Sequence, residues 1–138
     1  MNASIVKKEE FLEIVEQAHL AVFSDELNKN FFRFDFAIAV HEDSDPIGYT
    51  LVHELTSEDV EMTYGGVVQD HRNISSKEGF RLIIGRLKEM GYKNVLAQVE
   101  NKNIPMLRLA LSEDFLIIGN RTNKSGKQFM LLCKNLEG

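Results

Sequence analysis

The sequence predicts an α+β fold, with a mixed central sheet of six to seven strands flanked by about four helices. Two observations carry this prediction. Between residues 32 and 68, apolar side chains recur with a period of two in three segments separated by polar turns, which is typical of consecutive antiparallel strands. From residue 75 onward, helical and strand patterns alternate, which makes the sheet mixed. A chain of 138 residues is long enough to bury one core, so we expect a single domain over residues 1–138.

The first quarter of the chain is predicted to be one short strand followed by helices. Ala3–Val6 can form the strand. Residues 8–23 carry apolar side chains at helical spacing, namely Phe11, Ile14, Val15, Ala18 and Val22. Ser24, Asp25 and Glu26 suit the cap and first turn of a second short helix.

Three antiparallel strands are predicted over residues 32–40, 47–55 and 60–68, with polar turns at residues 42–46 and 56–59. The first should be half-buried, because large apolar residues alternate there with Arg33, Asp35 and alanines. Gly65 and Gly66 interrupt the third strand. Glycine weakens a strand interior, so the pair predicts a β-bulge or the close approach of a ligand. Accommodation of a bulky phenylalanine of the first strand is the alternative.

A long amphipathic helix is predicted from Ser75, which can form a capping box with Glu78, to its end at Gly91. Its apolar stripe consists of Phe80, Ile83, Ile84, Leu87 and Met90. A strand at 95–99, a helix at 103–112 with Pro105 in its first turn, and strands at 115–118 and 129–133 complete the order.

Composition and charge restrict the partners. The formal charge of −5 and pI near 5.4 argue against nonspecific binding to nucleic acid, which needs a basic face, and suit a cationic small molecule or a basic peptide. No apolar run approaches the roughly 20 residues of a membrane span, and the first residues lack the apolar core of a signal peptide. Cys133 is the only cysteine and cannot form an internal disulfide. We therefore expect a cytoplasmic protein that binds no membrane.

The most informative segment is Val67–Glu78, in which a strand runs through a polar loop into a helix. The start of a helix presents unpaired N–H groups and the positive end of the dipole, which suit phosphate oxygens. The loop is therefore a candidate pyrophosphate cradle. Ser75, Ser76 and Lys77 could add hydroxyl and ammonium donors. The alternative is that the serines only cap the helix and the lysine is solvated.

The order of elements, together with two local motifs, resembles the Gcn5-related N-acetyltransferase (GNAT) superfamily over essentially the whole chain. Gly91–Val95 looks like the family's turn out of its long helix. Asn103–Phe115 looks like the motif in which an Asn opens the next helix and a Gly-Phe pair closes it, with Asp114 at the glycine position. The family's pyrophosphate loop has an Arg or Gln, two residues, Gly, one residue, and Gly or Ala. Here Arg72 fits the first position, but Ser75 and Lys77 occupy the glycine positions, so the loop is degenerate.

This resemblance implies an acyl-CoA-dependent N-acyltransferase that moves acetyl from acetyl-CoA to a primary amine by direct attack, without a metal. The acceptor would be a small molecule or a peptide, and a homodimer is the default assembly for a small fold of this kind. The resemblance implies that a bulge near Gly65 and Gly66 separates the strands at 60–68 and 95–99. It assigns the freed backbone of Gly66, Val67 and Val68, and the side chain of Asn103, to the pantetheine arm and the thioester. Capping alone would also explain Asn103. The phosphate contacts fall to Arg72, Asn73, Ser75, Ser76 and Lys77.

Acyl transfer needs a neutral amine, and an amine with a pKa of about 10.4 is almost fully protonated at pH 7, so a base is useful. Glu61, where many family members keep a glutamate, is the first candidate, with Glu54, His53 and His71 as alternatives. Many members protonate the leaving thiolate with a tyrosine, and that position here is Ala110. Either solvent takes this role, or the chain is a noncatalytic protein of the same fold that binds acyl-CoA or a protein partner.

Overall fold

The computed structural model describes residues 1–7, 10, 34–43, 45–67 and 75–137. Seven strands and two α-helices lie within these ranges. In chain order they are β1 (Asn2–Lys7), β2 (Phe36–Glu42), β3 (Asp45–Glu54), β4 (Asp59–Val67), α2 (Ser75–Glu89), β5 (Asn94–Glu100), α3 (Ile104–Ser112), β6 (Leu116–Thr122) and β7 (Gln128–Asn135). The strand count confirms the prediction. The helix count does not match the expected four. Apart from residue 10, the two helices predicted at residues 8–23 and from residue 24 lie outside the described residues.

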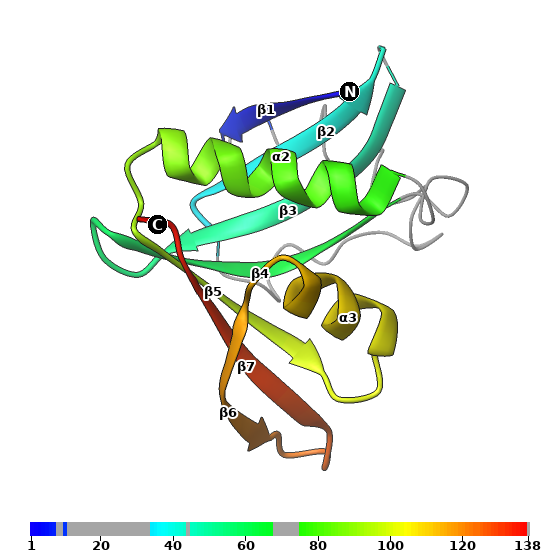
Figure 1. The fold of residues 1–138 in the computed structure, drawn as a ribbon, viewed down its shortest axis with the longest axis vertical. Coiled ribbons are helices and arrows are strands. Elements are labelled where there is room, and N and C mark those ends of the chain that lie inside the picture. The colour runs from blue at the N-terminus through cyan, green and yellow to red at the C-terminus, as the bar shows by residue number, and fades with distance from the viewer. Residues whose placement is uncertain (8–9, 11–33, 44, 68–74, 138) are drawn as a thin grey trace.

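The strands form one mixed sheet in the order β1-β2-β3-β4-β5-β7-β6 (Figure 1). Neighbouring strands are antiparallel except for β4 and β5, which are parallel. The parallel pair follows from the helical connection, because α2 carries the chain from the end of β4 back to the start of β5. The predicted α+β class with a mixed sheet is therefore confirmed.

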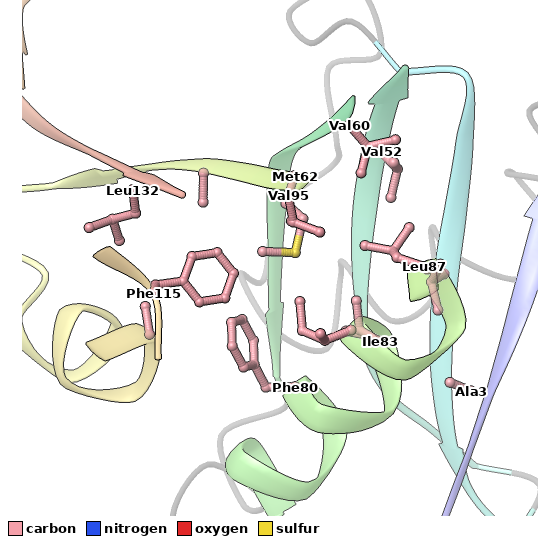
Figure 2. Close-up of a cluster of buried hydrophobic side chains, with 14 of the residues drawn as sticks. Ala3, Val52, Val60, Met62, Phe80, Ile83, Leu87, Val95, Phe115 and Leu132 are labelled. Carbon is pink, nitrogen blue, oxygen red and sulfur yellow. The ribbon is translucent and has the colours of Figure 1, made fainter. Parts of the chain in front are cut away.

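Both helices pack on the same face of the sheet around one core. Val60 and Met62 of β4 and Val95 and Ala97 of β5 belong to the same buried cluster as four residues of the predicted apolar stripe, Phe80, Ile83, Ile84 and Leu87. The fifth, Met90, lies beyond the end of α2 and is 40% exposed, so its prediction as a core residue is wrong. The rings of Phe80 on α2 and Phe115 after α3 lie 5.6 Å apart and join the two helices (Figure 2).

The opposite face of the N-terminal strands is buried as well. Ala37 and Ala39 of β2 and Tyr49 and Leu51 of β3 are buried but do not belong to the core cluster under the helices. The sequence prediction of a half-buried first strand is therefore wrong for the centre of β2, where residues 37–40 are all buried. Small apolar alanines fit a covered face as readily as an exposed one, so the alternation was misleading.

The predicted helix ends agree with the structure. Gly91 follows α2 with φ of 94°, the left-handed conformation expected of a helix stop. Asn103 caps α3, and its side-chain oxygen accepts a hydrogen bond from the N–H of Met106 at 3.3 Å. Within the described residues, no helix is long and apolar enough to span a membrane.

Asp114 adopts φ of 69° at the end of α3, at the position where the resembling motif has glycine. A left-handed backbone strains a residue that carries a Cβ, although Asp tolerates it better than most. Asp114→Gly should therefore raise the free energy of unfolding by about 0.5–1 kcal/mol, as measured by urea denaturation.

Gly91→Ala is the matched control for Asp114→Gly. A Cβ at Gly91 would meet nothing within 4 Å, so this change adds only backbone strain. It should lower the free energy of unfolding by about 1 kcal/mol. A loss of stability in Asp114→Gly would contradict the assignment of strain to Asp114.

Candidate functional site

Strands β4 and β5 pair over only part of their length. The parallel pairing joins Asp59–Met62 to Asn94–Ala97, whereas β4 continues to Val67 and β5 to Glu100. Beyond the last pair, no described strand pairs with the facing edges of the two strands, and Figure 1 shows them diverging. We call this opening between residues 63–67 and 98–100 the fork.

A β-bulge marks the point where the fork begins. Leu51 of β3 pairs with Tyr64 and Val52 pairs with Met62, so Thr63 is the extra residue in β4. The predicted bulge at Gly65 and Gly66 is therefore misplaced, because these glycines pair regularly with β3. A bulge bends its strand, and this one directly follows Met62, the last residue of β4 that pairs with β5.

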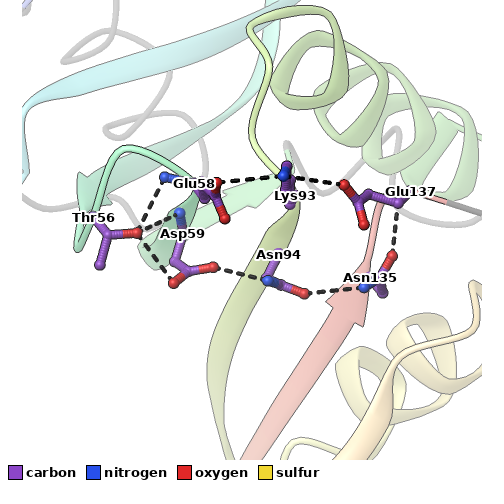
Figure 3. A network of polar contacts seen from close by, with 7 residues as sticks. All are labelled: Thr56, Glu58, Asp59, Lys93, Asn94, Asn135 and Glu137. Carbon is purple, nitrogen blue, oxygen red and sulfur yellow. Dashed lines mark hydrogen bonds and ion pairs between the residues drawn. The ribbon is translucent and has the colours of Figure 1, made fainter.

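Side chains fasten the closed end of the fork (Figure 3). The carboxylate of Asp59, at the start of β4, accepts a hydrogen bond from Asn94 of β5 at 2.8 Å. Asn94 in turn accepts one from Asn135 of β7 at 3.4 Å. The ammonium of Lys93 lies 3.3 Å from Glu58 and 3.4 Å from Glu137, and its hydrogen bond to Glu58 raises the pKa of Lys93. The fork is therefore tied at one end and opens at the other.

Two helix starts follow the open ends of the fork strands. Helix α2 begins at Ser75 after β4, and α3 begins just after Asn103, beyond the end of β5. The side-chain oxygen of Asn103 accepts the capping hydrogen bond from Met106. Among the described residues, no hydrogen bond uses its side-chain Nδ2. Asn103 can therefore cap α3 and still donate to a ligand.

Some of the other predicted cofactor residues lie within the described residues and some do not. Among the described ones, Gly66 and Val67 are the last two residues of β4, at the fork, and Ser75 and Ser76 are the first two residues of α2. The remaining loop residues, Val68, Arg72 and Asn73, lie outside the described residues, as does His71.

Lys77 has a protein partner that neither the phosphate prediction nor the alternative of a solvated lysine included, although its side chain is 52% exposed. Its ammonium lies 3.7 Å from the carboxylate of Glu113, a side chain that is only 10% exposed. Arg81 donates from Nε to both oxygens of the same carboxylate at 2.9 and 3.0 Å. The backbone oxygen of Glu113 also accepts a hydrogen bond from Lys134. Sequence reasoning missed Glu113, although the spacing of Lys77 and Arg81 on one side of α2 was the available signal.

Glu113 thus ties the end of α3 to the first turns of α2. Glu113→Gln should lower the free energy of unfolding by about 1–2 kcal/mol, because it removes charge-assisted hydrogen bonds at a nearly buried site. Urea denaturation would measure the loss. The matched control is Glu89→Gln on α2, whose side chain is 67% exposed and which should change stability by less than about 0.5 kcal/mol. Equal losses of stability in both variants would contradict the conclusion that Glu113 links the end of α3 to the start of α2.

Glu61 lies in the centre of a row of polar side chains on the sheet face away from the two helices. Its neighbours Val60 and Met62 point into the helix-side core, so Glu61 points the other way. It lies opposite His53 of β3, whose Nδ1 is 3.1 Å from Asp35. On the other side, Gln98 of β5 donates to the Glu61 carboxylate at 3.3 Å. The polar row then ends at Arg121 of β6, which donates to Gln98 at 2.5 Å.

The competing candidates are less well placed. Glu54 accepts a hydrogen bond from the Tyr92 hydroxyl at 3.2 Å. Burial raises the pKa of Tyr92, and the nearby carboxylate of Glu54 raises it further. Ala110 is completely buried in the core. Cys133 is partly rather than fully buried. Burial raises the pKa of its thiol, and the negative charge of Asp59 raises it further, so the nucleophilic thiolate is disfavoured. Among the described residues, no three His, Cys, Asp or Glu side chains gather as metal ligands.

Comparisons with known proteins bear on the fold. No family model and no curated protein matches the sequence. Solved structures match almost the whole chain. A GNAT family acetyltransferase from Elizabethkingia anophelis with acetyl-CoA bound is 16% identical, with a TM-score of 0.77 over 97% of this chain and 98% of that chain.

Two further structures are similar. The ribosomal-protein-S18-alanine N-acetyltransferase from Escherichia coli is 10% identical, with a TM-score of 0.75 over 99% of this chain and 95% of that chain. An aminoglycoside 6′-N-acetyltransferase complexed with coenzyme A is 11% identical, with a TM-score of 0.75 over 100% of this chain and 98% of that chain. The chain therefore has the fold of the GNAT acetyltransferases, as the sequence resemblance implied. At these identities the likeness is one of fold.

Proposed function

We propose that this protein is an acyl-CoA-dependent N-acetyltransferase, which moves acetyl from acetyl-CoA to a primary amine of a small molecule or a peptide. The observation that supports it best is the fork. A strand edge in the middle of a sheet normally pairs with its neighbour, because unpaired N–H and C=O groups are costly. An extended ligand that carries amides, such as the pantetheine arm of CoA, can pair with such an edge.

The proposal assigns the contacts with this ligand to residues of the fork, of the loop before α2 and of the two helix starts. In the proposal, the backbone of Gly66, Val67 and Val68 contacts the pantetheine and the thioester, and Asn103 donates from Nδ2 to an amide oxygen of the arm. The start of α2 receives the pyrophosphate at its N–H groups, with Ser75, Ser76 and Lys77 and with Arg72 and Asn73 of the preceding loop. Lys77 would then exchange its contact with Glu113 for a phosphate oxygen.

The bound cosubstrate supplies an activated acetyl group. Glu61 accepts the proton that the amine loses as it forms its new bond to the acetyl carbon, either directly or through water. A backbone N–H at the fork stabilises the negative charge on the carbonyl oxygen, a role worth about 3 kcal/mol where it has been measured. Because Ala110 carries no proton donor, solvent protonates the departing thiolate.

The similar structures support the choice of ligand and reaction class. Two of them were solved with acetyl-CoA or coenzyme A, and the names of two describe transfer to an alanine of a ribosomal protein and to an aminoglycoside. These properties belong to those proteins. They support an amine acceptor here without identifying it.

Calorimetry with CoA, followed by incubation of acetyl-CoA with a panel of amines, tests the proposal. CoA should bind and raise the melting temperature, since a ligand of the native state stabilises it. At least one amine should release free thiol from acetyl-CoA. No heat and no stabilisation at millimolar CoA would overturn the proposal. Binding without thiol release from any amine would favour the noncatalytic alternative, which the degenerate loop and Ala110 support.

Asn103→Asp separates the cofactor contact from the cap. Aspartate caps helices as well as asparagine does, but its side chain has no N–H donor. We expect a melting temperature close to that of the wild type and an affinity for CoA lower by about threefold to tenfold, the worth of one hydrogen bond. Titration calorimetry would measure both proteins. Unchanged affinity would mean that Asn103 serves only as a cap.

The proposal also covers location and assembly. The single cysteine supports a reducing compartment such as the cytoplasm. Leu116, Ile117 and Ile118 are exposed on β6 at the edge of the sheet and support a homodimer, which sedimentation would detect. The acidic net charge supports the absence of nucleic acid as a partner.

A further inference from the structure

The polar row continues beyond Glu61 across the C-terminal half of the sheet. Gln98 of β5 donates from Nε2 to Oε1 of Glu61 at 3.3 Å, and Arg121 of β6 donates from Nε to Oε1 of Gln98 at 2.5 Å. Arg121 is itself held by the ring of Phe129, its opposite residue on β7, which lies 4.8 Å from the guanidinium. The last residues of the row therefore form a chain of contacts that ends on the candidate base.

This chain of contacts determines which end of the Gln98 amide faces Glu61. A guanidinium has only donors, so Arg121 can bond only to the oxygen of that amide. The nitrogen must then point at Glu61, where a carboxylate needs a donor. The Glu61 carboxylate, which has only acceptors, favours the same orientation. Without Arg121 the amide oxygen loses this partner, and the Gln98 side chain is held by Glu61 alone. Arg121 therefore anchors the amide that contacts Glu61, although it does not touch Glu61.

Gln98 lies at the point where the fork begins. Gln98 directly follows Ala97, the last residue of β5 that pairs with β4, so its side chain bridges the two strands where the fork begins. Its hydrogen bond occupies one oxygen of Glu61. No hydrogen bond among the described residues reaches the other oxygen, Oε2, which is left for the amine or for a water.

We infer that Gln98 and Arg121 are positioning residues, which hold the Glu61 carboxylate through Oε1 and leave Oε2 to accept a proton. This inference rests on the proposed function. Arg121→Ala should lower kcat about tenfold, a fraction of the factor of 10² to 10⁴ that a placed base contributes, and leave KM for acetyl-CoA within twofold. Arg121→Lys keeps a charged donor at this position and should recover most of the rate.

A double-mutant cycle separates positioning from a merely structural effect. In a Glu61→Gln background, Arg121→Ala should cost little further rate, because the carboxylate that it positions is absent. Equal losses in both backgrounds, or no loss in the wild-type background, would overturn the inference. Melting temperatures of all variants should agree within a few degrees, since Arg121 is exposed on an edge strand.

A second readout does not depend on activity. The side-chain amide resonances of Gln98 in a nitrogen–proton NMR spectrum should shift in both Arg121→Ala and Glu61→Gln, and Arg121→Lys should restore them in the first case. If neither change moves these resonances, the inferred contacts do not exist and the inference is overturned. If the Gln98 resonances shift as expected but the wild-type protein transfers no acetyl group, the proposed function fails. The contacts among Glu61, Gln98 and Arg121 then remain as a structural feature of the sheet.

Discussion

Glu61→Gln should lower kcat for acetyl transfer by about 100-fold to 1,000-fold at pH 7, within the range that a positioned general base contributes. The amide keeps the size of the carboxylate but cannot accept the proton of the attacking amine. KM for acetyl-CoA should change little, because Glu61 lies at the closed side of the fork and not among the residues proposed to bind CoA. Steady-state rates of thiol release would measure both constants.

The loss should shrink as the pH rises. An amine with a pKa of about 10.4 gains neutral form tenfold for each pH unit below that value, so an enzyme without its base should speed up in the same proportion. Glu89→Gln, on an exposed turn of α2, is the control and should keep the wild-type rate. If Glu61→Gln kept most of its activity while His53→Gln lost it, the base would be His53, which the contact with Asp35 already orients.

Phe115→Ala is expected to have the largest effect on stability, a loss of about 3–5 kcal/mol in the free energy of unfolding. The Phe115 side chain is 2% exposed and packs on Phe80 between the two helices. Its removal leaves a cavity that the backbone of the sheet and of α2 cannot fill. Since such a domain is stable by only about 5–15 kcal/mol, the melting temperature should fall by about 10 °C.

Leu111→Ala provides the control for Phe115→Ala. Leu111 lies on α3 and is 45% exposed, so its change should lower the free energy of unfolding by less than about 1 kcal/mol. Thermal and urea denaturation of the two variants would be compared. A loss below about 1 kcal/mol in Phe115→Ala would mean that the joint between α2 and α3 contributes little to the fold.

Local signals predicted most elements correctly. The start of α2 at Ser75, its glycine stop, the Asn103 cap and the presence of three central antiparallel strands depend on short-range chemistry, and these agree with the structure. The predicted capping box of Ser75 with Glu78 stays a prediction. The predicted ends of β6 and β7 were too early, because the polar residues at the ends of these two strands carry little strand pattern. The bulge at Thr63 left no mark, since a non-glycine bulge depends on the register between two strands.

The candidate site shows the same division. Glu61, Asn103 and the start of α2 could be named from spacing and from the resemblance. The partners of these residues could not, because Gln98 contacts Glu61, and Arg121 contacts Gln98, from strands far along the chain. Glu113 contacts Lys77 from the end of another helix. Hydrogen bonds between distant segments leave no periodic pattern in a sequence.

By itself, the sequence determined the class of fold and the places where helices begin and end, because turn chemistry, capping and apolar period act over a few residues. Only the tertiary structure decided that β4 and β5 separate after Met62 and Ala97, and which face of the sheet carries the polar row. Both depend on the register between strands, which is set by the packing of the whole sheet against its helices.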